Sequence, residues 1–179
     1  DGNKLRLSLN AQTNRDADIF ETVLELTESA SQFVFHGIAS KPTPSILRGF
    51  SAPVILTYGY DDTALAFLAE HDDDPFNRWD AIQRLFVMAV LATLSGSDAA
   101  DASASLASVI TKILADNQLD PAYKALALSV PGEGYIAEQL SQVDPVAMRA
   151  ARSAVTMHLA VTLEQQFVDC FEASVRPDP

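Results

Sequence analysis

The first 60 residues alternate between apolar and polar side chains, which is the pattern of strands that bury one face. In the first run, Leu5, Leu7 and Leu9 fall on one side of the chain. Turn-forming stretches rich in Asn, Asp, Ser and Pro separate this run from later runs of the same kind. No helical pattern lies between them, so the sequence predicts antiparallel sheet with strands at 4–10, 19–27, 32–38 and 52–60.

The pattern changes at Asp61, where alanine becomes frequent and the apolar period lengthens to that of a helix. An Asp-Pro pair occurs at 74–75, 120–121 and 144–145, and each of these three pairs predicts a helix start. The carboxylate can accept an orphan backbone N–H, while proline sets the first helical φ. Asp61 or Asp62 is expected to cap the first helix, and Gly96 to end the second. Helices are therefore expected at 61–73, 74–98, 103–118, 121–130, 134–142 and 144–175.

Together these patterns predict an α+β chain in two parts, with sheet in residues 1–60 and helices in residues 61–179. Medium helices joined by short turns are typical of stacked helix pairs, as in an α-solenoid, although no strict sequence period is present. Hydrophobic residues make up 48% of the 179 residues, which is enough for a buried core.

Charge and composition limit the partners. The formal net charge of −12 makes nucleic acid a poor partner, because such a chain repels a phosphate backbone. The most apolar run, Leu85 to Leu94, is much shorter than the roughly 20 residues that span a bilayer, so no membrane partner is expected. Cys170 is the only cysteine and no signal-peptide pattern opens the chain, which favours a cytoplasmic location. The start at Asp1 without Met suggests a piece of a longer polypeptide.

Residues that could carry chemistry are scattered rather than clustered. His36, His71 and His158 have no partner at helical spacing, so no metal site is expected from this chain alone. The acidic run at 70–74 lacks the alternating oxygen ligands and central glycine of a calcium loop. It is more typical of a solvated turn that caps the next helix.

The remaining candidates also favour a structural role. The stretch "PGEGY" at 131–135 lacks the preceding strand and the lysine of a phosphate-binding loop, which indicates a turn. Cys170 lies beside Asp169 and Glu172, whose negative charges disfavour a reactive thiolate, so it is expected to pack. No catalytic, cofactor-binding or metal-binding residue is therefore expected in this chain.

The start of the second expected helix carries a charged and aromatic cluster. Trp79 is the only tryptophan, and at helical spacing it shares a face with Ile82 and Phe86. This spacing predicts that Trp79 anchors the helix on a neighbour. Asp80 and Arg84 form an i, i+4 pair of favourable order.

Two joined motifs, in the right order, are specific enough to indicate a family. The first is "PTPSILRGFSAPVILTYGY" at residues 42–60, and the second is a Phe-x-Arg-Trp-Asp-Ala pattern formed by Phe76, Arg78, Trp79, Asp80 and Ala81. They resemble the stretch that closes the small β-sandwich domain of bacterial aminopeptidase N and the helical segment that follows it. The upstream strand at 32–38 and the Asp-Pro helices at 119–152 resemble the same family. The resemblance covers the whole chain and is strongest over residues 31–90.

The resemblance implies a zinc metallopeptidase that removes N-terminal residues from peptides. In that family the catalytic residues lie in a thermolysin-like domain with an H-E-x-x-H motif, and this chain has no such motif. The resemblance therefore implies a non-catalytic fragment that is inactive alone and has no cofactor of its own, with zinc in the parent enzyme. Residues 1–60 would be the C-terminal part of an Ig-like β-sandwich domain, and residues 61–179 the N-terminal part of an α-helical superhelix domain.

In such enzymes the sandwich is a spacer and the helical domain covers the active-site cavity. The implied partners are the catalytic domain of the same polypeptide and, for the parent enzyme, peptide substrates. Arg48 and Arg78 are expected to make interdomain contacts or, as the alternative, surface ion pairs of little worth. For Arg78, a carboxylate of the run at 70–74 is a further expected partner. An open strand edge or uncovered helices would also favour self-association.

A stand-alone interaction module without enzymatic activity is the alternative hypothesis. Both hypotheses predict strands followed by stacked helices, so the pattern alone does not separate them. The reading frame upstream of Asp1 does, because only the peptidase hypothesis predicts an H-E-x-x-H motif there.

Overall fold

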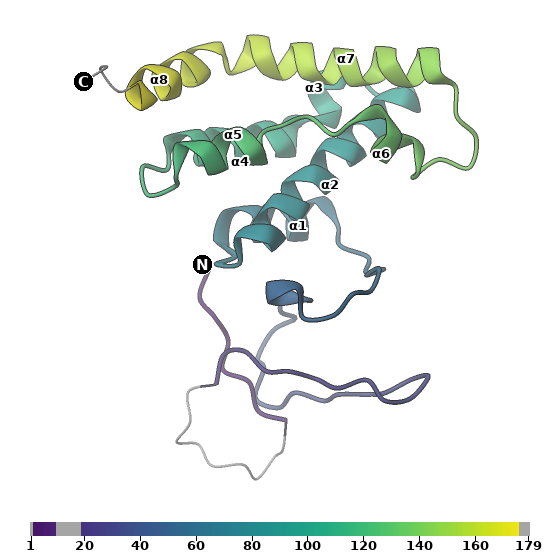
Figure 1. Ribbon diagram of the computed structural model, residues 1–179, viewed down its shortest axis with the longest axis vertical. Coiled ribbons are helices and arrows are strands. Elements are labelled where there is room, and N and C mark those ends of the chain that lie inside the picture. Colours follow the sequence, from purple (N-terminus) through teal and green to yellow (C-terminus); the bar gives the residue numbers. More distant parts are fainter. Residues whose placement is uncertain (1, 10–18, 176–179) are drawn as a thin grey trace. The chain divides into compact units, whose positions relative to one another are not determined.

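The computed structural model describes residues 2–9 and 19–175 and divides the chain into two compact units, Asp1–Pro44 and Ser45–Pro179 (Figure 1). Across these described residues no β-strand is present, and every helix belongs to the second unit. Each unit is described by itself below.

The first unit is an extended chain with isolated backbone hydrogen bonds. The Leu7 N–H donates to the Ile19 carbonyl at 2.7 Å, and the His36 N–H donates to the Ser8 carbonyl at 2.8 Å. None of the described residues of this unit is buried, and Val23 is 81% exposed. Strand register is fixed mainly by burial of one face, so these bonds do not extend into a ladder. The strands expected at 19–27, 32–38 and the described part of 4–10 are therefore absent, and the β-sandwich stays a prediction.

The second unit begins with the helix starts that the sequence predicts. Helix α1 (Asp62–His71) is capped by Asp61, whose Oδ1 accepts the Ala64 N–H at 2.8 Å. Helix α2 (Pro75–Leu94) has Asp74 as its N-cap and proline in its first turn, and Gly96 takes a positive φ of 102° just after it. The strand expected at 52–60 is not formed in this unit either.

Later helices agree with the sequence in three places. Helix α4 (Ala104–Ala115) lies within the expected 103–118, and α5 (Pro121–Ala127) and α7 (Pro145–Thr162) begin at their Asp-Pro pairs. Asp120 and Asp144 both cap through Oδ1, as Asp74 does. Each of the three predicted Asp-Pro helix starts is therefore confirmed, at α2, α5 and α7.

Three shorter helices differ from expectation. Helix α3 (Ala99–Ala102) is one unpredicted turn capped by Asp98. Helix α6 (Glu133–Ala137) is shorter than 134–142, because the N–H groups of residues 139 and 140 bond three residues back and tighten the last turn. The helix expected at 144–175 is divided into α7 and α8 (Glu164–Ser174) at Leu163, which leaves helical geometry with φ −110° and ψ 17° and enters the core at 4% exposure.

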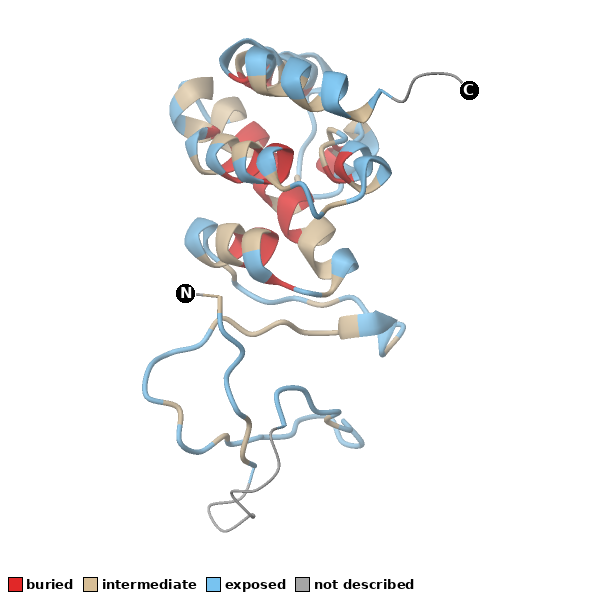
Figure 2. Cartoon of the chain, turned by 90° about the vertical axis from the view of Figure 1, so that its left-hand side faces the viewer, coloured by how far each residue is buried: buried red, intermediate tan, exposed pale blue. Residues whose placement is uncertain are grey.

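The core of the second unit is built around α2. Its residues Ile82, Phe86 and Val90 are at most 2% exposed and meet the buried faces of α4 and α7. Figure 2 shows the buried residues between the helices and the exposed ones on the outer faces. Burial of each large side chain is worth about 1.5–3 kcal/mol, so packing rather than helix propensity holds the array together. The buried apolar residues that α4 and α7 contribute are Leu106, Val109, Ile110, Ile113, Leu114, Met148, Ala151, Val155 and Leu159.

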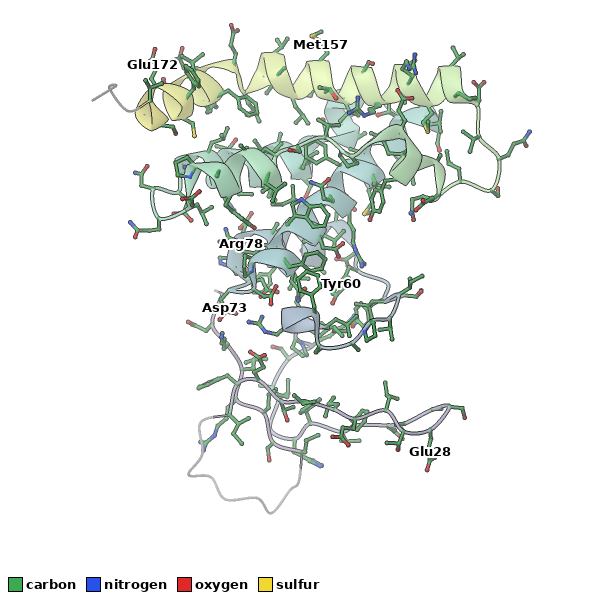
Figure 3. All side chains as sticks on the ribbon, in the orientation of Figure 1. Glu28, Tyr60, Asp73, Arg78, Met157 and Glu172 are labelled. Atoms are coloured by element: carbon green, nitrogen blue, oxygen red, sulfur yellow. The ribbon has the colours of Figure 1, made fainter. Side chains whose placement is uncertain are left out.

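The outer faces of α7 and α8 remain partly apolar. Met157 is 65% exposed and points away from the other helices (Figure 3).

Among the described residues, no helix has both the length and the apolar character needed to cross a membrane.

Candidate functional site

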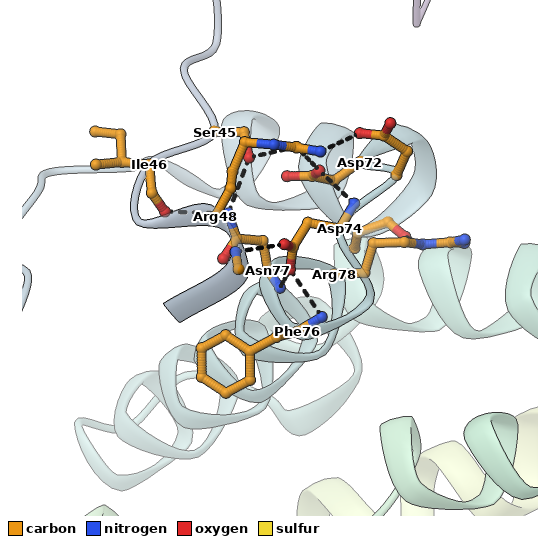
Figure 4. A network of polar contacts seen from close by, with 11 residues as sticks. Ser45, Ile46, Arg48, Asp72, Asp74, Phe76, Asn77 and Arg78 are labelled. Carbon is orange, nitrogen blue, oxygen red and sulfur yellow. Dashed lines mark hydrogen bonds and ion pairs between the residues drawn. The ribbon is translucent and has the colours of Figure 1, made fainter. Parts of the chain in front are cut away.

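A cluster of charged contacts joins the short turn η1 (Arg48–Phe50) to the turn between α1 and α2 (Figure 4). Arg48 donates from Nη1 to Asp72 Oδ1 and from Nη2 to Asp73 Oδ1, both at 2.5 Å. Asp72 Oδ1 also accepts the Asp74 N–H at 2.9 Å, which fixes the carboxylate at the end of α1. These three residues, Arg48, Asp72 and Asp73, are called the arginine clamp below.

Asp74 links the same two segments through its second oxygen. Its Oδ1 accepts the Phe76 and Asn77 N–H groups at 3.0 and 2.9 Å, which caps α2. Its Oδ2 accepts the Gly49 N–H at 2.8 Å. Asp74 therefore serves both as a helix cap and as an anchor for η1.

Asn77 completes the connection one turn into α2. Its Nδ2 donates to Ser45 Oγ at 2.9 Å and to the Ile46 carbonyl at 3.1 Å. Ser45 Oγ also accepts from Arg48 Nη1 at 3.0 Å. The stretch from residue 45 to residue 50 is thus held to α2 at several points.

Burial and charge make the arginine clamp the strongest part of this cluster. The Asp72 side chain is 1% exposed, and among the described residues its Oδ2 has no hydrogen-bond partner. Burial by itself would lower the pKa of Arg48, but the hydrogen bonds to Asp73 and Asp72 outweigh it and raise that pKa. For Asp74, a carboxylate, burial acts in the opposite direction and by itself would raise the pKa. The backbone N–H groups that it accepts and the Arg48 charge outweigh burial and lower that pKa. Both groups are therefore held in their charged forms.

The structure corrects the carboxylate contact expected for Arg78. Its Nε donates to the Ala69 carbonyl at 3.1 Å, and in the described part of the chain it pairs with no carboxylate of the run at 70–74. Figure 4 shows its side chain pointing away from Arg48, which takes these carboxylates instead. The run is also not simply solvated, since Asp72 is buried. Sequence reasoning missed this pairing because Arg48 and Asp72 lie 24 positions apart, and no periodicity relates them.

The aromatic cluster has the packing role that the sequence predicts. Trp79 is partly buried against the core, and its ring lies 5.5 Å from that of Phe76. Phe76 in turn lies 4.2 Å from Phe50, so the stack extends from α2 onto η1. The i, i+4 pair of Asp80 and Arg84 is present at 2.8 Å.

Two cavities of the helical unit are too small for a peptide or a cofactor. One of about 20 Å³ lies between the chain at Ile46, Leu56 and Tyr60 and the helices α1 and α2. Another of about 170 Å³ lies between α2 and α4, beside Met88 and Ser105. Ligand pockets usually measure about 300–1,000 Å³, so neither is a substrate site.

The other sequence candidates are not brought together. His71 lies 3.8 Å from Glu70, while His158 contacts Thr162 at 3.3 Å on α7. His36 lies in the other unit. In residues 2–9 and 19–175, no group of three His, Cys, Asp or Glu side chains could hold a metal ion.

Cys170 and the "PGEGY" stretch have local structural roles. Cys170 packs against the core on α8, with the buried Lys124 Nζ 3.9 Å from its sulfur. Gly132 is the N-cap residue of α6, so the stretch both turns and starts a helix. The described contacts of the cluster at 45–50 and 72–77 thus hold the stretch at 45–50 to the start of α2.

Comparison with known proteins matches two family models to the chain, one after the other. Residues 4–59 match the family model DUF3458, a domain of unknown function with an Ig-like fold. Residues 62–179 match DUF3458_C, a domain of unknown function with ARM repeats. The helical unit is thus of the ARM-repeat type, which agrees with the expected stacked helix pairs.

Relatives of this chain are peptidases by name. The chain is 31% identical over 160 residues to Aminopeptidase N of Escherichia coli strain K12, covering 88% of this chain and 18% of that protein. It is 34% identical over 144 residues to Aminopeptidase N of Caulobacter vibrioides, covering 80% of this chain and 17% of that protein. A crystal structure of Legionella pneumophila aminopeptidase A in complex with aspartic acid is similar, with a TM-score of 0.68 and 26% identity over 79% of this chain and 17% of that one. The chain therefore belongs to the aminopeptidase N family and spans less than a fifth of the length of these relatives.

Proposed function

We propose that this chain is a non-catalytic part of a zinc-dependent aminopeptidase. Its Ig-like region acts as a spacer, and its ARM-repeat region covers part of the active-site cavity. The observation that carries the proposal is the 31% identity to Aminopeptidase N of Escherichia coli over 88% of this chain. Because the match occupies 18% of that relative, most of such a polypeptide is available for a catalytic domain.

The chemistry of the proposed enzyme belongs to that catalytic domain. There a zinc ion would activate a water molecule, and a glutamate would act as general base. The described residues of this chain contribute rigidity and a wall that limits access of bulk water and of large substrates. The proposed partners are the catalytic domain of the same polypeptide and peptides with a free N-terminus, in the cytoplasm.

Exposed apolar side chains support a role inside a larger assembly. Val146, Met157 and Val161 on α7 are 79%, 65% and 67% exposed, and Phe171 on α8 is 70% exposed. Where exposed apolar side chains form one continuous patch, they usually mark contact with other protein. This exposure favours a part of a larger enzyme over a stand-alone module, and in the isolated chain it would promote self-association. A monomeric mass in light scattering at high concentration would argue against that association.

The decisive test of the proposal is the complete reading frame together with size selectivity. An H-E-x-x-H motif upstream of Asp1 is expected, whereas a start codon directly before Asp1 would favour the stand-alone module. The purified longer polypeptide should hydrolyse short peptides and become slower as the peptide lengthens, because the cover restricts entry. Equal rates on short peptides and on unfolded proteins would refute the cover.

A further inference from the structure

Residues 45–59 belong to one region by sequence and to another by packing. The Ig-like family model extends to residue 59, whereas the compact unit that contains the helices begins at Ser45. This stretch includes η1 and its contacts with the arginine clamp and with Asp74. The end of the Ig-like region is therefore packed as part of the helical unit.

The backbone of this stretch is held in a conformation that it would not adopt alone. Leu47 and Phe50 have φ values of 59° and 55°, and Gly49 between them has a φ of 59°. Residues other than glycine disfavour this left-handed region, and they remain there only where the surrounding contacts fix them. Phe50 is also 69% exposed, so burial of its own side chain does not provide that restraint. The polar contacts therefore act together with the ring contact between Phe50 and Phe76 to provide it.

Among these contacts, the pair of Arg48 and Asp72 dominates. The Asp72 side chain is 1% exposed and already has one oxygen without a partner, so loss of Arg48 would strand a buried charge. The Asp73 side chain is 53% exposed, and an ion pair at such a position contributes little. A matched exposed pair exists elsewhere, where Arg149 meets Glu133 at 2.9 Å.

We infer that Arg48 is a positioning residue that, through buried Asp72, locks the end of the Ig-like region onto the turn between α1 and α2. This attachment of residues 45–50 to the helices of the second unit is called the joint below. The consequence for substrate access rests on the proposed function, whereas the joint itself is a property of this chain. The two are therefore tested separately.

The joint is tested by hydrogen exchange on the 179-residue chain. Arg48→Lys keeps a positive charge beside Asp72 but loses the fork that reaches two carboxylates. We expect the Gly49 amide to exchange at least about tenfold faster, with protection in α2 and α4 unchanged. Trp79, which stacks on Phe76 beneath Phe50, should become more accessible to acrylamide quenching.

Two further variants keep the test decisive. Arg149→Lys is the control and should leave the Gly49 amide unchanged. Asp72→Asn should reproduce the effect of Arg48→Lys, and the double variant should be no worse than either one, because both changes break one interaction. Unchanged exchange at Gly49 in Arg48→Lys, or loss of protection throughout the helices without a selective effect, would overturn the joint.

The consequence is tested in the longer aminopeptidase that carries this chain. With Arg48→Lys, kcat/KM for long peptides should rise at least about threefold while that for a dipeptide substrate stays constant, because a looser joint widens entry. If the Gly49 amide exchanges faster in Arg48→Lys while the preference for short over long peptides stays the same, the joint is supported and the proposed cover is refuted. A change of kcat on the dipeptide alone would contradict a positioning role.

Discussion

Replacing Asp74 separates its role as an anchor for η1 from its role as a helix cap. Asp144 is a matched control, because it follows the same Asp-Pro pattern and accepts two N–H groups at 3.0 and 3.1 Å through one oxygen. Asp74 accepts the equivalent two bonds, and its other oxygen accepts a third from the Gly49 N–H at 2.8 Å. Any excess effect at Asp74 therefore measures its attachment to η1, which comprises the third bond and the attraction of the Arg48 charge.

The expected magnitudes follow from these contacts. Loss of an N-cap costs about 1 kcal/mol of unfolding free energy, which is the expected effect of Asp144→Ala. The additional bond to a charged oxygen is worth about 1.5 kcal/mol at the low end, and exposure reduces it to about 1 kcal/mol. Asp74→Ala should therefore cost about 2 kcal/mol, or roughly 4–8 °C in Tm for a chain of this size.

Asparagine substitutions sharpen the comparison. Asparagine caps a helix about as well as aspartate, so Asp144→Asn should be nearly neutral. Asp74→Asn should still cost about 1 kcal/mol, because its amide group would face the Gly49 N–H, donor against donor. Urea unfolding, followed by circular dichroism at 222 nm and by Trp79 fluorescence, measures the free energy of unfolding of the variants at positions 74 and 144. Equal effects at positions 74 and 144 would refute the reasoning.

The pH dependence of the Asp74 contribution provides an independent check. Its pKa in the folded chain is lowered from the ordinary 3.8, so its stabilisation is complete above the unfolded pKa. It is lost as the pH falls through the lower folded value. The stabilities of the native chain and of Asp74→Asn should therefore converge in strong acid, and a constant difference down to that range would contradict this assignment.

Three other predictions concern two buried polar groups and the partly buried Tyr60. Gln83→Leu should cost about 1–3 kcal/mol in urea unfolding, because Gln83 Nε2 donates to two carbonyls near the end of α5, both at 3.1 Å. Lys124→Ala should cost about 2 kcal/mol or more in the same assay, since it removes a buried stem and the donor to the Leu114 carbonyl at 2.8 Å. Burial first, and then the neighbouring Tyr58, raise the pKa of Tyr60 from 10.0 to about 12. The stability that Tyr60 contributes is thus complete below pH 10 and is lost between pH 10 and 12. Tyr60→Phe should remove this part of the loss. If the phenol of Tyr60, identified as the difference in absorbance between the native chain and Tyr60→Phe, titrated with a midpoint near 10, the assignment would be contradicted.

Local signals in the sequence located the helix starts well. The Asp-Pro pairs at α2, α5 and α7 combine a side-chain acceptor with a preset φ, and both features act within four residues. The division at Leu163 was not predictable, because it depends on where one side chain enters a core built by distant helices. The strands that the sequence predicts did not form in the described residues for a related reason. Alternation shows which faces a strand could bury, but a strand forms only where another layer covers that face.

The candidate site shows the same limit on a smaller scale. The acidic run at 70–74 was recognised as a turn that caps α2, and Asp74 confirms the cap. The sequence offered Arg78 as a partner of this run, whereas the partner in the structure is Arg48, because the path of residues 45–50, which no sequence period encodes, brings Arg48 there. The family motifs drew attention to both arginines without saying which one binds. Tertiary structure was needed to assign Arg48 to Asp72 and Arg78 to the Ala69 carbonyl.

The most direct test of the central claim is an assay of the purified 179-residue chain for bound zinc and for hydrolysis of an alanyl chromogenic substrate. The account predicts that zinc does not bind stoichiometrically and that no turnover remains after purification, because the reacting groups belong to another part of the polypeptide. Stoichiometric zinc together with turnover that a chelator abolishes would contradict it.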